Sequence, residues 1–185
     1  MRKSREAAAD TRRKIVDAAA DSFRRTGIHA TGLSNVMSDA GLTHGGFYRH
    51  FRSKDQLVAE ACVAGIGDIV AALKDSADKK AGKDAFLAVV ARYLSTEHRN
   101  NVTKGCPIAA LGSELAREDK ETRLAASTGV EELVDLVLQH SGRDHAHAVV
   151  TVAAMIGAVT MSRIIYEKMD SDSVLRYVKS HLAEI

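Results

Sequence analysis

The feature that most constrains this fold is a break between two short helical patterns at Gly41-Leu42-Thr43. Before the break, residues 33–40 place apolar side chains at helical spacing, and after it Phe47 and Phe51 stand one helical turn apart. A glycine ends the first pattern, as is common at the C-terminus of a helix. Two short helices joined by so tight a turn form a helix-turn-helix, and residues 8–25 supply a third amphipathic helix that completes its core.

Helical periodicity continues through the remainder of the 185 residues, and strand-like alternation is absent. The predicted fold class is therefore all-α, with about nine helices. We expect a helix-turn-helix domain at residues 1–55, with the motif itself at about 32–51, and a larger helical domain at residues 56–185. The later helices are expected to begin at the S-x-x-Q capping box of residues 53–56 and then to cover residues 83–98, 106–116, 121–140, 145–168 and 171–183. Residues with capping or stop chemistry are predicted at the ends of these helices: Gly27, Pro107, Gly142, Asp144, and either Ser171 or Asp172.

Composition and charge narrow the class of protein. The chain has two cysteines, with 45% hydrophobic and 27% charged residues, as in an ordinary soluble protein. No secretory signal is present, and the longest weakly polar stretch, residues 148–161, is shorter than the roughly 20 residues of a membrane span, so we expect a cytoplasmic protein without a membrane partner. Residues 1–57 carry 11 Lys and Arg against 6 Asp and Glu, whereas residues 58–185 carry 15 against 18. This asymmetry favours a polyanion partner for the first part, although a basic solvated face gives the same balance.

The residues after the turn have the pattern expected of the first turn of a recognition helix. In a helix-turn-helix this second helix enters the DNA major groove with its N-terminal end first. Thr43 is predicted to cap it, and His44, Gly45 and Gly46 to form its first turn. Each glycine disfavours a helix by about 1 kcal/mol. We interpret the pair as leaving the first turn without bulk, so that the backbone can approach the groove.

Four further side chains have the chemistry of DNA contacts. Tyr48, Arg49 and His50 carry groups that donate to phosphates or to base edges. Lys54 stands at the start of the next helix, where free N–H groups and the helix dipole favour a phosphate. The alternatives are that Tyr48 packs between helices, that His50 bonds a local carbonyl and that Arg49 is a solvated surface charge.

Residues 11–61 resemble the N-terminal domain of the tetracycline-repressor (TetR) family. The pattern G-x-x-x-G-x-[FL]-Y-x-[HY]-F-x-[ST]-K-[ED]-x-L is matched by Gly41, Gly45, Phe47, Tyr48, His50, Phe51, Ser53, Lys54, Asp55 and Leu57. The resemblance implies an all-helical homodimer that binds double-stranded operator DNA and releases it when its C-terminal domain binds a small-molecule effector. It also implies phosphate contacts from the tyrosine, histidine and lysine positions, and base reading by the first turn of the recognition helix.

The chain departs from the common family pattern at this interface. Gly32 and Gly46 stand where many members have a polar side chain, and His44 stands where lysine or arginine is frequent. Each glycine removes one side-chain contact. The residues expected to compensate are Thr31, Ser34 and Thr43.

An effector pocket is expected among the middle helices, as the resemblance implies. Its candidate lining residues are Phe86, Val90, Tyr93, Leu94, Cys106, Leu111, Leu133, Met155 and Met161. Ordinary core packing produces the same apolar stripes, so it remains an alternative for each of them. The last two helices fit the dimer face of the family, with small residues at 153, 154, 157 and 158, although these also suit packing within one chain.

Cys106 stands in a Gly-Cys-Pro segment at a helix start, with Lys104 nearby. A helix dipole and a neighbouring cation both lower the pKa of a thiol. The segment resembles a subgroup of the family in which a few relatives sense electrophiles or oxidants. The plain alternative is a small buried residue at the start of a helix.

These patterns predict a DNA-binding transcriptional regulator, a repressor that binds a palindromic operator as a homodimer and is released by a small-molecule inducer. The alternative is a redox or electrophile sensor of the same fold that acts through Cys106; a non-specific DNA binder and an enzyme are the other classes considered. No catalytic residue or cofactor is predicted, because the chain has no nucleophile elbow, phosphate loop or paired carboxylates. No metal site is predicted, because His145 and His147 are two residues apart and point away from each other on a helix.

Overall fold

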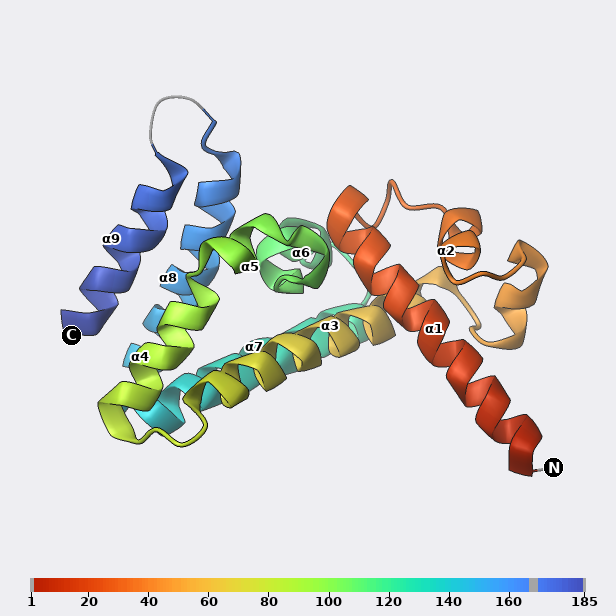
Figure 1. The fold of residues 1–185 in the computed structure, drawn as a ribbon. Coiled ribbons are helices and arrows are strands. Elements are labelled where there is room, and N and C mark those ends of the chain that lie inside the picture. The colour runs from red at the N-terminus through yellow and green to blue at the C-terminus, as the bar shows by residue number, and fades with distance from the viewer. Residues whose placement is uncertain (1, 167–169, 185) are drawn as a thin grey trace.

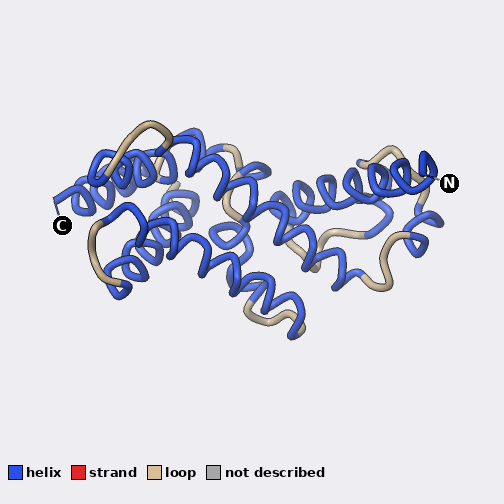
Figure 2. Tube along the Cα trace, turned by 90° about the horizontal axis from the view of Figure 1, so that it is seen from below, coloured by secondary structure: helices blue, strands red, loops and turns tan. Residues whose placement is uncertain are grey.

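The computed structural model describes residues 2–166 and 170–184, and every regular element within these residues is helical. The elements are α1 (Arg2–Thr26), α2 (Leu33–Asp39), η1 (His44–Arg49), α3 (Lys54–Ala77), α4 (Gly82–Tyr93), α5 (Thr96–Asn100), η2 (Val102–Lys104), α6 (Pro107–Leu115), α7 (Lys120–Ser141), α8 (His145–Ile164) and α9 (Ser171–Glu184). The predicted all-α fold class is confirmed. Figures 1 and 2 show an elongated molecule with α1 and α2 at one end and α8 and α9 at the other.

The N-terminal end is a small three-helix module. Glycines in left-handed backbone conformations end its first two helices, with φ of 90° at Gly27 and 72° at Gly41. The module closes over one apolar core, whose buried members are Ile15, Ala19, Phe23, Val36, Met37, Phe47, Phe51 and Leu57. The helix-turn-helix predicted from the sequence is therefore present.

The long helices α3 and α7 form the centre of the molecule and run side by side (Figure 1). Their close approach depends on Gly129 of α7, where a methyl group would come within 2.2 Å of the Ile66 side chain on α3. On the far side α8 packs along both α7 and α9. Because α3 starts in the N-terminal module and ends beside α4, it is the rigid connection between the two ends of the molecule.

Several predicted helix ends are confirmed in atomic detail. Ser53 accepts from the backbone N–H of Gln56 at 3.1 Å, and the Gln56 side chain accepts from the backbone N–H of Arg52 at 2.8 Å. Asp144 caps α8 by accepting from the His147 N–H at 2.9 Å. Gly142 ends α7 with φ of 65°, and Pro107 takes the first position of α6.

Other helix boundaries differ from the predictions. The first helix begins at Arg2 rather than at residue 8, and the helix predicted for residues 83–98 breaks at Leu94, after which Ser95 caps α5. The residue that caps α9 is Asp170, which accepts from the Asp172 N–H at 3.0 Å, rather than Ser171 or Asp172. The helix predicted for residues 145–168 ends at Ile164, and residues 167–168 lie outside the described residues.

The apolar content of two helices exceeds what the sequence analysis expected. By length and composition alone, α3 and α8 are long and apolar enough to cross a membrane, because their many Ala, Val and Ile residues offset the polar ones. In these helices 50% and 39% of the apolar stretch is buried inside the molecule. Core helices of water-soluble proteins meet the same criterion, so this finding is weak support for a membrane span.

Candidate DNA-binding surface and its link to the helical body

The helix-turn-helix presents a polar surface on a rigid apolar base. Met37, Phe47 and Phe51 are fully or almost fully buried, and the two phenylalanine rings stack with centroids 5.5 Å apart. The neighbouring Tyr48 meets Phe47 edge to face at 5.1 Å yet leaves 68% of its own surface exposed. The tyrosine side chain is therefore braced at one side of its ring and otherwise largely open to solvent, as a DNA contact requires.

Most of the predicted contact residues share this exposed surface. The exposed ones are Ser34, Thr43, His44, Gly45, Tyr48 and Arg49, and the half-buried ones are Gly46 and His50. Because these residues come from α2, the turn and η1, the fold brings together the groups that the sequence analysis singled out.

The recognition element is a 3₁₀ helix, not an α-helix. It spans His44–Arg49, and Thr43 occupies its N-cap position without a side-chain capping bond, so the predicted capping role of Thr43 is wrong. The two glycines in its first turn disfavour an α-helix, and 3₁₀ turns occur in short segments of this length. Nothing inside the protein requires them: a methyl group would meet no atom within 4 Å at Gly45 and only the Met37 side chain, at 3.6 Å, at Gly46.

The structure places Thr31 and Lys54 differently from the prediction. Thr31 is only 3% exposed, and its hydroxyl donates to the carbonyl of Gly27 at 2.6 Å. The ammonium group of Lys54 donates to the carbonyls of Ile28 and Thr31 at 2.6 and 2.8 Å. Both side chains satisfy backbone groups of the α1–α2 loop, so their first role is to hold that loop in place.

One residue of this module was missed by the sequence analysis. The guanidinium group of Arg12 lies over the ring of Phe51, 4.1 Å from its centroid, and donates to the backbone carbonyl of His50 and to the carboxylate of Glu60. Arg12 thereby ties α1 and α3 to the end of η1. An arginine on the polar face of a helix carries no sequence signal for such a role.

A second missed residue connects the module to the body. The carboxylate of Glu114, on α6, accepts from the backbone N–H groups of Ile28 and His29 at 2.8 and 3.2 Å. A side chain at Gly27 would clash with it, because a Cβ there would lie 2.9 Å from Glu114 Oε1. Next to it, Glu118 Oε1 lies 3.2 Å from His29 Nε2. The C-terminus of α1 is thus held by acidic side chains of α6 and the segment after it.

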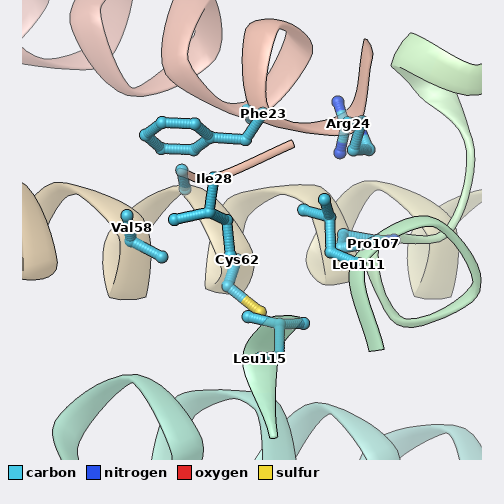
Figure 3. A pocket seen from close by; sticks show the side chains of 10 residues that line it. Phe23, Arg24, Ile28, Val58, Cys62, Pro107, Leu111 and Leu115 are labelled. Carbon is cyan, nitrogen blue, oxygen red and sulfur yellow. The ribbon is translucent and has the colours of Figure 1, made fainter. Parts of the chain in front are cut away.

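The same contact includes a buried arginine. The guanidinium group of Arg24 pairs with Asp21 at 3.0 Å, and Asp21 also pairs with Lys104 of η2 at 2.9 Å. Figure 3 shows Arg24 beside Pro107, with Cys62 nearby, where α1, α3 and α6 meet. Space of about 10 Å³ remains among these side chains, room for about one water molecule. The two ends of the molecule therefore share a packed boundary.

The predicted effector pocket is not a single cavity. Most of its candidates are buried core residues, namely Phe86, Val90, Tyr93, Leu94, Cys106, Leu111, Leu133 and Met155. Met161 is instead 55% exposed and lines a surface hollow between α8 and α9. Apolar periodicity selects every inward residue of a helix, and it does not distinguish those that pack fully from those that border open space.

The surroundings of Cys106 also differ from the prediction. The thiol is fully buried, and burial raises its pKa, while Lys104 pairs with Asp21 instead of approaching the sulfur. The backbone N–H of Cys106 donates to Nε2 of His98 at 2.8 Å. Burial lowers the pKa of the His98 imidazole, and this effect outweighs the Tyr93 carbonyl, 2.6 Å from Nδ1, which acts to raise the pKa.

Two buried polar atoms of residues that interact with Cys106 lack a hydrogen-bond partner among the described residues. One is the hydroxyl of Tyr93, whose pKa is raised by burial and then by its interactions with the Cys106 thiol. Nη1 of Arg163 is likewise buried without a hydrogen-bond partner among the described residues. The other nitrogens of that guanidinium donate to the carbonyls of Arg99 and His98 at 3.0 and 3.2 Å. Among the described residues, no group of three or more His, Cys, Asp or Glu side chains is placed to hold a metal ion.

A polar helix-turn-helix surface on a buried aromatic base, joined to a larger helical body, defines a DNA-binding protein of the helix-turn-helix class. Residues 15–61 match the family described as "Bacterial regulatory proteins, tetR family". The chain is 30% identical over 188 residues to the uncharacterized HTH-type transcriptional regulator Rv0196 of Mycobacterium tuberculosis, with 92% of this chain and 93% of that protein covered. The chain belongs to the TetR family of bacterial transcriptional regulators.

Solved structures agree with this assignment. A TetR transcriptional regulator from Chloroflexus aurantiacus superposes with a TM-score of 0.78 and 25% identity over 100% of this chain and 96% of that one. The reduced form of Escherichia coli NemR superposes with a TM-score of 0.82 and 22% identity, covering 95% and 96% of the two chains, and supports the fold. The protein is thus a TetR-family helix-turn-helix regulator.

Proposed function

We propose that this regulator is a dimeric repressor that binds a palindromic operator and is released by a small-molecule inducer. The observation that carries the proposal is the exposed polar surface of η1 on its buried aromatic base, in a module whose α1–α2 loop is bonded to Glu114 of α6. TetR-family regulators bind operator DNA as dimers, so two copies of this surface would read two half-sites about one turn of DNA or more apart. We propose binding as its whole activity, with no catalytic step, in the cytoplasm.

Within this surface we propose distinct roles. Tyr48, Arg49 and His50 contact phosphates, while His44 and the glycine backbone after it face the base edges. Residues 1–55 act as the DNA-binding domain and residues 56–185 as the effector and dimerisation domain. Lys54 has one remaining ammonium proton beyond its two carbonyl bonds, so any phosphate contact from it is secondary to its role in the loop.

The proposed dimer face lies on α8 and α9. Met161, Ile164 and Tyr177 are exposed apolar side chains on these two helices, and Met161 and Tyr177 line a hollow of about 400 Å³. Small residues at Ala154 and Gly157 leave room for the close approach of a partner helix. An apolar surface of this kind is typical of a site that a second protein surface covers.

The experiment is a mobility-shift titration with the DNA upstream of the gene. We expect salt-sensitive binding that prefers one sequence over competitor DNA. Arg49→Ala should weaken binding to all sequences and lower the salt dependence by about one released ion. Lys83→Ala, at an exposed position in the first turn of α4 and outside both the DNA surface and the dimer face, is the matched control and should change nothing. Equal affinity for operator and competitor DNA would contradict the proposal.

A second candidate function, redox sensing through Cys106, is favoured by the buried Tyr93 hydroxyl and Arg163 guanidinium that interact with its thiol. In such a reaction a peroxide would transfer one oxygen to the thiol, giving a sulfenic acid and water, or an alcohol from an organic peroxide. In this candidate function the Tyr93 hydroxyl and the Arg163 guanidinium, which both interact with the thiol, would donate to that oxygen. Mass spectrometry after peroxide treatment should then show one added oxygen on Cys106 and loss of operator binding that Cys106→Ser prevents. Full protection of the thiol would exclude this candidate and leave the repressor proposal intact.

A further inference from the structure

The described part of the chain contains an apolar groove between α7 and α8 that the predicted pocket did not include. The groove has a volume of about 310 Å³, at the small end of the range for ligand sites. Its apolar walls are Val130 and Val134 of α7 with Val149, Val152, Ala153 and Ile156 of α8. The walls come from two packed long helices, so the groove is a feature of the scaffold rather than of a loop.

Two carboxylates line the same groove. Glu131 and Asp135 stand one turn apart on one face of α7, where two like charges repel each other. Both are exposed, and neither forms an ion pair or hydrogen bond with another described residue. The remaining titratable group in the lining is the imidazole of His145, at the start of α8. The groove thus combines apolar walls with two carboxylates that have no ion-pair partner among the described residues.

The groove is also connected to α6. Val130 borders both this groove and a second hollow of about 210 Å³ between α6 and α7. Leu115 of α6 lines that hollow and also the boundary with the DNA-binding module. A molecule that separates α7 from α8 therefore presses on side chains that contact α6, the helix whose Glu114 holds the end of α1.

We propose that the α7–α8 groove is the effector site and that its ligand is a small organic cation, an amine with an apolar aromatic or alkyl body. The ammonium group would pair with Glu131 and Asp135 while the apolar body displaces water from the valine walls. An anionic ligand would meet two carboxylates without a counter-charge. This inference rests on the proposed function, since it specifies the inducer of the repressor.

The test uses three probes of matched shape and different charge: phenylbutylamine, phenylbutanol and phenylbutyrate. Calorimetric titration of the full-length protein should show that the amine binds with the highest affinity, that the alcohol binds more weakly and that the acid does not bind. In Glu131→Gln/Asp135→Asn the affinity for the amine should fall by about tenfold, while that for the alcohol stays the same. Glu132→Gln, on the adjacent exposed position of α7, is the charge control and should behave as wild type.

A second pair of variants tests the place of binding. Ala153→Trp should fill the groove and abolish binding of amine and alcohol, whereas Ala146→Trp, exposed on α8 outside the groove lining, should not. Equal affinity for the three probes, or amine binding unaffected by both the double variant and Ala153→Trp, would overturn the proposal. So would light scattering in which Ala153→Trp converts a dimer into a monomer, because a second copy would then occupy the groove. Operator binding measured in parallel separates the two proposals: intact DNA binding without amine binding refutes only the effector site.

Discussion

Replacing Glu114 by alanine tests the connection between the DNA-binding module and the helical body. The substitution removes the acceptor of two hydrogen bonds, from the N–H groups of Ile28 and His29 at 2.8 and 3.2 Å. Ile28 is buried, so its N–H loses its partner, whereas His29 is exposed and its N–H can bind water instead. An unsatisfied buried donor costs about 1–3 kcal/mol, and we therefore expect a loss of about 2 kcal/mol in the free energy of unfolding.

Thermal and urea denaturation measure this loss directly. For a chain of this size, about 2 kcal/mol corresponds to a fall in Tm of about 4–8 °C. Glu114→Gln keeps one acceptor oxygen at the same position, so its loss should be smaller. Glu132→Ala, at an exposed position of α7 without an ion pair among the described residues, is the control and should leave Tm unchanged.

The same variant should change regulation as well as stability. With the link removed, the C-terminus of α1 no longer follows α6, so operator affinity should respond less to an inducer than in the wild type. A free energy of unfolding for Glu114→Ala within about 0.5 kcal/mol of the wild-type value, the usual range for a surface substitution, would refute the energetic argument. Wild-type induction in that variant would refute the coupling argument separately.

Three further predictions concern other parts of the molecule. Gly45→Leu should preserve Tm, because a Cβ at this position meets nothing within 4 Å. It should weaken operator binding by about tenfold or more in a mobility shift, because the leucine side chain would enter the DNA groove. Unchanged affinity would contradict the role assigned to this glycine. Because the pKa of His98 is lowered below its ordinary 6.5, the unfolded chain binds a proton at this imidazole more readily than the folded chain does. The stability due to this group is therefore present above pH 6.5 and is lost as pH falls through the folded-state pKa. In unfolding measured against pH, His98→Asn should lose less stability on acidification than wild type, and parallel curves would refute this. Met161→Asp should produce a monomer in light scattering, since this side chain is 55% exposed on the proposed dimer face, and a persisting dimer would place the interface elsewhere.

The helices and the helix-turn-helix were predictable because their signals are local. Apolar residues at helical spacing identified the core positions Phe47 and Phe51, and the glycines at 27 and 41 take the left-handed conformation that ends a helix. The 3₁₀ form of η1 was not predicted, although the two glycines that favour it are visible in the sequence.

The uses of the polar side chains were less predictable. Lys54 has the side-chain chemistry of a phosphate contact, but its ammonium group donates hydrogen bonds to two backbone carbonyls, 26 and 23 residues away. Cys106 has the neighbours of an activated thiol in sequence, yet burial outweighs them and raises its pKa. In both cases the deciding atoms belong to other elements.

By itself the sequence determined the all-helical class, the position of the DNA-binding motif and its family, because helix periodicity, caps and turns depend on residues within about four positions of one another. Tertiary structure alone decided how the two ends are joined and where open space remains. Glu114 reaches Ile28 across 86 residues, and the groove beside Glu131 exists only because α7 and α8 pack without filling the space between them. Such contacts depend on how whole helices pack against one another, and no local sequence pattern encodes which residues far apart in the chain will meet.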